Sequence, residues 1–355
     1  MRATTQQRNS NIELLRCILM VQILFYHLLV HGTKGIFFKI FDWQPLPLTR
    51  LETVFLILCM YPVDCFVIIS GYYGITIIKD GKIRFSRLLK TYVPLFFYSV
   101  LFATIAFCTN KIGVKEYGYN FLPVLQANYW FASCYIILVF FSPVLNAVFE
   151  FFYKKKSFIL AFIVLGFANY FLTNGKFSEL MGMGANRFYM LVYCYFVGRF
   201  LNAYEDNLCL LKNQKIVLLL LFFSFVAEYG LIVFLQILFG KNYWVHLSLN
   251  SSPLTILQAI LVFSLFRNFH PYSNKIINQM GAASFAIYLI TENSYVRRPL
   301  YTLINGEGNK DTVFLIPYLI FCAVVVSAVC ISIDLIRSKT VFIFCKLCQR
   351  KLKND

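Results

Sequence analysis

Two ionisable side chains, Arg16 and His27, lie inside one long apolar stretch near the start of the chain. This stretch, residues 13–31, has close to the ~20 residues that an α-helix needs to cross the hydrocarbon core of a bilayer. A charged arginine at the centre of such a helix costs roughly 2.5–3.5 kcal/mol, and ionisable residues found there usually have a function. A neutral imidazole can remove a proton near neutral pH. The pair is therefore the first candidate for chemistry.

Arg16 and His27 share one face of the predicted helix. Eleven residues at 100° each end only about 20° past three full turns, and the rise between the two residues is about 16 Å. This separation excludes direct contact but suits the two ends of one long ligand. A second interpretation stays open, in which Arg16 reaches the inner headgroups and His27 bonds a neighbouring helix.

The start of this helix has the form of a capping box, Ser-Asn-Ile-Glu at residues 10–13. In a capping box the serine caps the first turn and the glutamate reaches back to the amide of the serine. We therefore expect a structural role for Glu13, with Ser10 as the cap.

The composition requires a membrane around this helix. Hydrophobic residues make up 59% of the 355 residues and charged residues 14%, whereas soluble domains have about half and about a quarter. We predict an all-α, polytopic bundle in the lipid bilayer, built from about ten spans. The predicted spans are 13–31, 51–73, 91–109, 129–150, 157–173, 188–204, 215–239, 253–268, 282–298 and 312–336.

The net charge of +17 follows from this topology. With the N-terminus in the cytoplasm, about twice as many Lys and Arg residues fall in inner segments as in outer ones, as the positive-inside rule requires. We predict a multi-pass protein of the bacterial plasma membrane with both termini cytoplasmic, a membrane domain over residues 1–336 and a basic tail over 337–355. No nucleic-acid partner is expected.

The cysteines do not indicate a metal site. The eleven cysteines are scattered, mostly within the spans, where they serve as small apolar packing residues. Cys345 and Cys348 form one CxxC, but no second pair or histidine completes a zinc site. We expect no metal.

The second span ends in a run of spaced polar and small residues, Asp64-x-Phe66-x-x-x-Ser70-Gly71-Tyr72. Small residues let helices or a ligand approach closely, and a serine can bond across a bundle. Packing between helices explains this pattern as well as a substrate does.

The loop after the second span carries Arg84, Arg87 and Lys90, spaced three residues apart at the start of a helix. Inner loops are basic in any case, and anionic lipid attracts them. The same spacing also suits the phosphates of a nucleotide cofactor that enters from the cytoplasm. Both interpretations stay open.

Two outer positions complete the candidates, Trp130 at the start of the fourth span and Glu292 late in the ninth. Trp130 is either an interfacial belt residue or part of the site. The carboxylate of Glu292 can hold His27 in one tautomer and stabilise its imidazolium. Alternatively, Glu292 pairs with Arg297 or Arg298 at the rim.

Taken in order, these segments resemble the membrane-bound acyltransferase-3 family. The resemblance rests on Arg16-x10-His27, the 64–72 segment, the basic stretch, the Trp130 helix and Ser-Phe-x-x-Tyr-Leu-Ile at 284–290. A histidine often follows that last segment in the family, but Thr291 stands there in this chain. The resemblance implies transfer of an acyl group, usually acetyl from acetyl-CoA, to a glycan.

The resemblance also assigns roles to the candidates. The expected catalytic residues are His27, as general base or as covalent acyl carrier, and Glu292. The expected contacts of acetyl-CoA are Arg16, Ser70, Arg84, Arg87 and Lys90. The expected contacts of the glycan acceptor are Asp64, Tyr72 and Trp130. Two alternatives from other classes are a transporter or flippase, which also buries Arg and His along its pathway, and a structural partner of a glycan-synthesis complex.

Overall fold

The computed structural model describes residues 9–33, 51–75, 78–79, 82–83, 86–125, 129–155, 157–173, 183–240, 252–309 and 312–351. In these ranges the chain is helical apart from two short strands, β1 (Ile78–Lys79) and β2 (Lys82–Ile83), which pair antiparallel. The all-α prediction is therefore confirmed for the described ranges.

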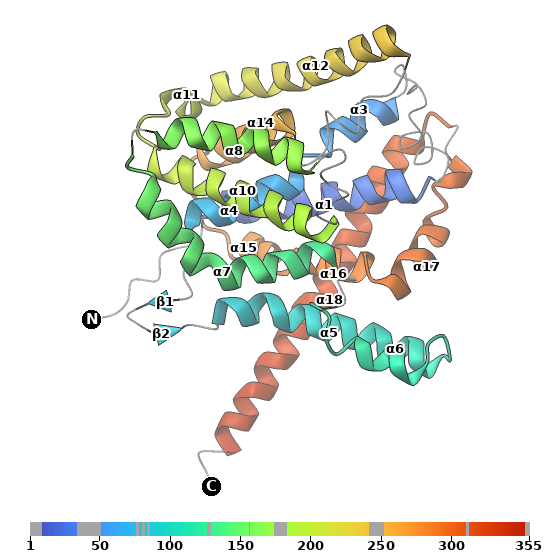
Figure 1. Cartoon of the computed structure of the whole chain (residues 1–355). Helices are drawn as coiled ribbons and strands as arrows, with labels where there is room; N and C mark the ends of the chain where they lie inside the picture. The colour runs from blue at the N-terminus through green and yellow to red at the C-terminus, as the bar shows by residue number, and fades with distance from the viewer. Residues whose placement is uncertain are drawn as a thin grey trace.

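The helices follow the predicted spans closely over most of the chain (Figure 1). They are α1 (Ser10–His31), α3 (Leu51–Leu58), α4 (Pro62–Tyr73), α5 (Ser86–Cys108), α6 (Val114–Tyr119), α7 (Trp130–Phe152), α8 (Phe158–Thr173), α10 (Met183–Ala203), α11 (Cys209–Lys212), α12 (Gln214–Phe239), α14 (Pro253–Arg267), α15 (Lys275–Ala283), α16 (Phe285–Thr291), α17 (Ser294–Ile304) and α18 (Leu315–Lys351), with a short 3-10 helix at Glu307–Asn309.

Six helical segments of the described chain are long and apolar enough to cross a membrane. They are α1, the α3–α4 segment, α5, α7, α12 and α18, while α8 and α14 contain shorter apolar helices. The total of ten spans and the placement of the termini remain predictions. We call the end of the bundle at which α1 begins, near Ser10, the inner end, and the end at which α1 finishes, near His31, the outer end.

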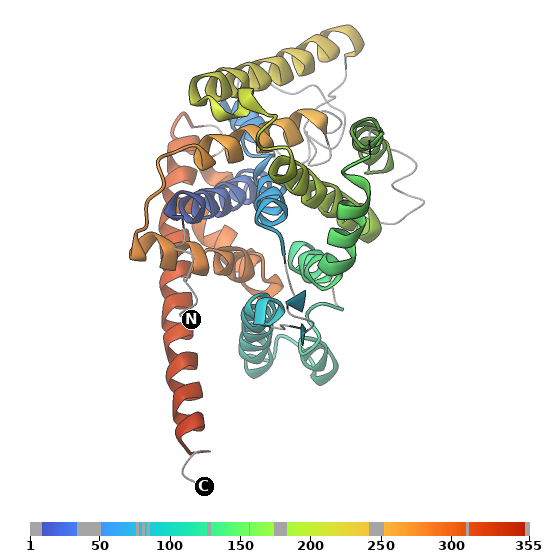
Figure 2. The same cartoon turned by 90° about the vertical axis from the view of Figure 1, so that its left-hand side faces the viewer.

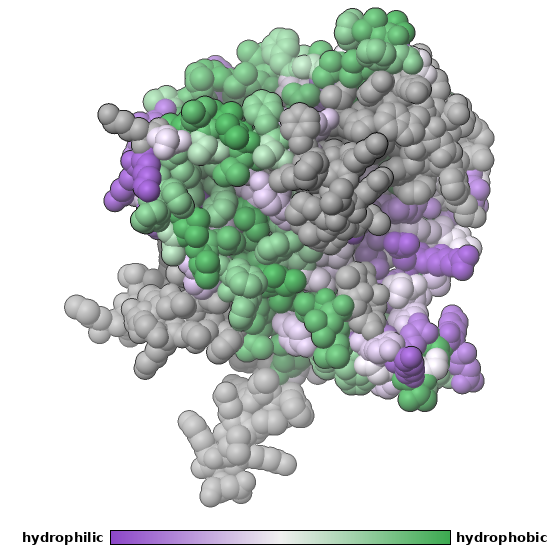
Figure 3. All heavy atoms as spheres, viewed as in Figure 1, coloured by the Kyte–Doolittle hydropathy of each residue, from purple (hydrophilic) through white to green (hydrophobic). Residues whose placement is uncertain are grey.

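The surface of the bundle is apolar where lipid would touch it. Figure 3 shows hydrophobic residues across the middle of one face and hydrophilic residues at its two opposite ends. On α12, for example, Phe222 is 62% exposed and Ile237 is 75% exposed. Such continuous apolar exposure is unfavourable in water and normal in a bilayer, so this is a membrane protein.

The core is built around α1 and α4, which lie side by side in the centre of the bundle (Figures 1 and 2). Leu15, Leu19 and Leu28 of α1 are fully buried. Gly71 of α4 lies directly against the Tyr195 carbonyl of α10, so a Cβ at this position would overlap that oxygen. The glycine of the 64–72 segment is therefore needed for helix packing.

The predicted capping box at the start of α1 is wrong. Asn9 is the cap, and its side chain accepts a hydrogen bond from the Asn11 amide. Ser10 already lies inside the helix, and its hydroxyl donates to Asn278 Oδ1 of α15 (2.8 Å). Glu13 pairs with Arg16 instead of reaching back, with 3.3 Å between Oε1 and Nη1. The start of α1 is thus capped by Asn9 and held against α15 by Ser10.

The predicted span 282–298 is also wrong as a single helix. The chain forms α15, α16 and α17 in this region, with a bend at Glu292 and Asn293. Asn293 is extended (φ −62°, ψ 132°), and its side chain accepts from the Tyr295 amide, which starts α17. The bend matters because it carries Glu292.

Candidate active site

The outer part of α1 and the bend after α16 bring His27 and Glu292 together. His27 Nδ1 lies 2.9 Å from Glu292 Oε1, and the two side chains are 16% and 10% exposed. A carboxylate that accepts from Nδ1–H fixes the tautomer in which Nε2 is unprotonated. The imidazole can then use Nε2 as a base, and the carboxylate stabilises the imidazolium that forms.

Glu292 has two further partners at the same bend. The Tyr301 hydroxyl of α17 donates to Oε1 (2.7 Å), and Arg297 Nη1 lies 3.5 Å from Oε2. Both sequence interpretations of Glu292, as partner of His27 and as partner of Arg297, therefore hold at once. Glu292 lies outside the six spans; burial alone would raise the pKa of its carboxyl, but His27, Tyr301 and Arg297 together lower this pKa. These three partners favour the ionised carboxylate.

Two tyrosines that the sequence did not single out support this arrangement. Tyr301 also stacks on His31, one turn beyond His27, with 6.5 Å between ring centroids and 7° between planes. Tyr129 donates to the Leu289 carbonyl (3.0 Å) and accepts from the Asn293 side chain, so it holds the bend. No sequence spacing indicates these contacts, because the bend itself brings the residues together.

A cavity of about 910 Å³ lies at the inner end of the bundle, on the Arg16 side of α1. Its walls come from α1, α4, α5, α7, α15, α16 and α18. Among the described residues, four basic side chains line it, Arg16, Lys90, Arg337 and Lys339, against one carboxylate, Asp334. The volume is within the usual range for ligand sites, about 300–1,000 Å³, and the charge favours an anionic ligand.

Arg16 enters this cavity between a carboxylate and an aromatic ring. Its Nη1 lies 3.3 Å from Glu13 Oε1, and its guanidinium lies 5.9 Å from the Phe66 ring centroid. Glu13 and Phe66 hold the arginine without covering it, since its side chain is 29% exposed. The two ionisable residues of α1 thus lie in two different places: Arg16 lines the inner cavity, and His27 lies at the outer bend.

The other expected cofactor contacts fall into three groups. Lys90 lines the cavity. Ser70 shares a hydrogen bond with the Tyr135 hydroxyl (2.9 Å), and Tyr135 lines the cavity in its place. Arg84 lies outside the described residues, and of Arg87 only the backbone, within α5, is described.

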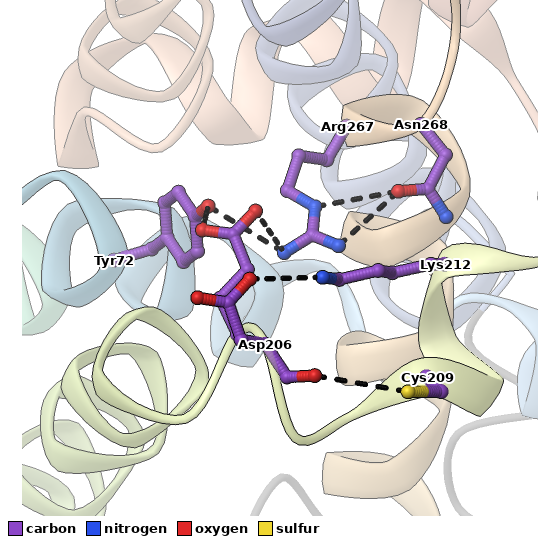
Figure 4. A network of polar contacts seen from close by, with 7 residues as sticks. Tyr72, Asp206, Cys209, Lys212, Arg267 and Asn268 are labelled. Carbon is purple, nitrogen blue, oxygen red and sulfur yellow. Dashed lines mark hydrogen bonds and ion pairs between the residues drawn. The ribbon is translucent and has the colours of Figure 1, made fainter.

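Tyr72 does not reach His27 but belongs to a polar network at the inner end (Figure 4). Its hydroxyl donates to Glu205 Oε2 (2.7 Å), and Arg267 Nη1 lies 3.3 Å from Glu205 Oε1. Arg267 ends α14 close to the start of α1, because Asn11 donates to the Phe269 carbonyl (3.2 Å). The network ties α4 to α14 and to the segment after α10.

We expect Tyr72→Phe to lower the free energy of unfolding by about 1 kcal/mol, because it removes one hydrogen bond to a partly exposed carboxylate. Thermal unfolding of the purified protein in detergent measures this. Tyr73→Phe is the matched control, because Tyr73 is the next residue along α4 and its side chain is 52% exposed. Equal unfolding temperatures for wild type and Tyr72→Phe would contradict the structural role.

The two remaining expected acceptor contacts lie on different helices. Asp64 is fully buried in α4, and neither of its carboxylate oxygens has a hydrogen-bond partner in the described chain. Trp130 carries the Arg187 guanidinium 4.9 Å from its ring centroid. The structure therefore does not bring Asp64, Tyr72 and Trp130 together at one place.

Comparison with known proteins identifies the family of the chain. The sequence model of an acyltransferase domain family, acyltransferase 3, matches residues 9–337. No match was found among curated proteins or among solved structures. The matched range includes Arg16, the inner cavity up to Arg337, and the His27–Glu292 pair. The chain therefore belongs to the acyltransferase-3 family and is a membrane acyltransferase.

Proposed function

We propose that the protein is an O-acetyltransferase of the plasma membrane that moves acetyl from cytoplasmic acetyl-CoA to a hydroxyl of a cell-surface or lipid-linked glycan. The observation that carries this proposal is that the two parts of α1 face two different places. Its inner half presents Arg16 to a basic cavity, and its outer part presents His27 to Glu292. One long, anionic donor with a reactive far end fits both places.

The inner cavity is the proposed donor site. The phosphates of coenzyme A are the anions that its four basic side chains would bind. Between Arg16 and His27 the helix rises about 16 Å, and the narrow pantetheine arm would follow α1 over this distance. Ser70 acts through Tyr135, which it orients in the cavity wall.

The outer bend is the proposed site of transfer. A sugar hydroxyl attacks the carbonyl carbon of the thioester while His27 Nε2 takes the hydroxyl proton. The carbon–sulfur bond then breaks, and the imidazolium returns the proton to the thiolate of coenzyme A. Glu292, held by Tyr301, stabilises the imidazolium. In the two-step route the same nitrogen first takes the acetyl group as the thiolate of coenzyme A leaves. The hydroxyl then takes the acetyl group from the imidazole and leaves its proton on that nitrogen, and the imidazolium returns this proton to the thiolate.

Mass spectrometry of surface glycans tests the proposal. Cells that lack this protein are compared with the same cells complemented by wild type. Acetyl esters that disappear and return with the protein would support the proposal and identify the acceptor. Unchanged acyl groups with altered glycan export would contradict it and favour a transporter, whereas a succinyl ester would change only the donor.

We expect Tyr301→Phe to lower kcat about 3- to 10-fold, because Glu292 loses one charged hydrogen bond but keeps His27 and Arg297. The pKa of Glu292 should rise, since Tyr301 stabilises the ionised carboxylate. Ionised Glu292 stabilises the imidazolium, so its protonation adds to the loss of activity as pH falls, and in Tyr301→Phe this part of the loss should begin at a higher pH than in wild type. A pH–rate profile of the purified enzyme measures the difference, and Tyr295→Phe in the same helix is the control.

A further inference from the structure

The basic residues of the inner cavity fall into two classes. Arg16 and Arg337 are each paired within the protein, Arg16 with Glu13 (3.3 Å) and Arg337 with Asp334 (2.6 Å). Lys90 and Lys339 are exposed, and no carboxylate of the described ranges lies within 4.0 Å of either ammonium group. Among the described residues, the two lysines are therefore the cavity cations whose charge no carboxylate neutralises.

Arg337 is fixed in the wall of the cavity by more than one contact. Asp334 accepts from its Nε and also from the Tyr98 hydroxyl (2.9 Å). The guanidinium lies 5.7 Å from the Phe97 ring centroid. These contacts from α5 attach α18 to the cavity, so the residues that follow Arg337 have a defined position.

Lys90 and Lys339 lie toward the inner mouth of the cavity, on two different helices. Lys90 is in the second turn of α5, which begins at Ser86. Lys339 follows Asp334 on α18 by five residues, about 7.5 Å further along the axis. Figures 1 and 2 show that the C-terminal part of α18 continues past the rest of the bundle. Arg16, by contrast, is about 9 Å into α1 from Ser10.

We propose that Lys90 and Lys339 bind the 3′-phosphate of the donor, so that the site distinguishes coenzyme A from 3′-dephospho-coenzyme A. This inference rests on the proposed function. Coenzyme A carries a diphosphate next to the pantetheine arm and a separate monoester phosphate on the ribose. The arginines deeper in the cavity face the diphosphate, while the monoester at the far end meets the two lysines. Compact ammonium groups suit such a phosphate as point charges.

The inference assigns a role to residues beyond the predicted membrane domain. Lys339 falls in the 337–355 segment, which sequence reasoning treats as a basic tail, and its charge alone suggests only attraction to anionic lipid. Its position in the cavity wall with Arg337 gives it a specific ligand instead. Lipid phosphate is the competing source of the same chemistry, and a binding experiment in lipid-free detergent separates the two.

The test measures binding of coenzyme A and of 3′-dephospho-coenzyme A to the purified full-length protein in lipid-free detergent, by calorimetry. Wild type should bind coenzyme A at least tenfold more tightly. Lys90→Ala and Lys339→Ala should each reduce this ratio about 3- to 10-fold, and the double variant should bring it near one. The Kd of 3′-dephospho-coenzyme A should change less than about twofold in every variant, which also shows that the cavity is intact.

Lys155→Ala is the matched control, because Lys155 is an exposed lysine that does not line the cavity and whose ammonium lies 4.2 Å from the Phe151 ring centroid. Its binding ratio should equal that of wild type. Equal binding of both nucleotides by wild type would overturn the inference and leave the proposed function standing. Equal weakening of both nucleotides in the lysine variants would overturn it too, because the lysines would then act only as general charge. Failure to bind either nucleotide would overturn both proposals.

Discussion

His27→Ala should lower kcat by about 10²- to 10⁴-fold, the usual contribution of a positioned general base. A sugar hydroxyl is a weak nucleophile at neutral pH, and His27 pairs with the Glu292 carboxylate at 2.9 Å. The KM for acetyl-CoA should change little, because the proposed phosphate site near Arg16 is about 16 Å away along α1. Acetylated glycan should therefore nearly vanish from cells that carry only this variant.

Mass spectrometry of surface glycans in complemented cells, at matched membrane levels of the protein, measures this loss. His270→Ala is the control, because His270 is an exposed histidine in the segment between α14 and α15. It should restore acetylation as wild type does. Equal restoration by His27→Ala would exclude His27 as the catalyst and favour a structural role for the protein in glycan synthesis.

Most of the helices could be predicted from the sequence, because apolar stretches of span length are a direct consequence of the bilayer thickness. The expected span 215–239, for example, is α12 at Gln214–Phe239. The expected span 282–298 failed because the polar run 291–294 interrupts the apolar pattern, and Asn293 caps a new helix, α17, by accepting from the Tyr295 amide. This cap is a local signal that span length alone does not use. The contact of Asn293 with Tyr129, by contrast, comes from a distant part of the chain.

The chemistry of the site could be predicted in part for a similar reason. An ionisable group within an apolar stretch stands out in the sequence, so Arg16, His27 and Glu292 could be singled out as candidates. Tyr301 and Arg337 were missed because their neighbourhoods are ordinary and only the folded chain places them beside Glu292 and the cavity. Family resemblance identified the 64–72 segment but not the direction of its side chains, which depends on the packing of α4 against α10 and α14.

Glu292→Gln tests whether the Glu292 carboxylate orients His27. We expect it to lower kcat by about 10²- to 10⁴-fold. The glutamine keeps the size of the side chain, but its amide can donate to Nδ1 of His27 and so favour the tautomer that carries its proton on Nε2. That tautomer cannot remove a proton from the hydroxyl. The KM for acetyl-CoA should stay within about twofold, because Glu292 is far from the cavity along the bundle.

Single-turnover kinetics of the purified enzyme separate this tautomer effect from a loss of folding. Glu116→Gln is the matched control, since Glu116 also accepts from a tyrosine of α17, Tyr295 (3.1 Å), but contacts no histidine in the described chain. Glu292→Asp keeps the charge with a shorter reach, so it should retain more activity than the glutamine variant. If Glu292→Gln kept wild-type kcat, the carboxylate would serve only Arg297 and the bend, and His27 would need another group to orient it.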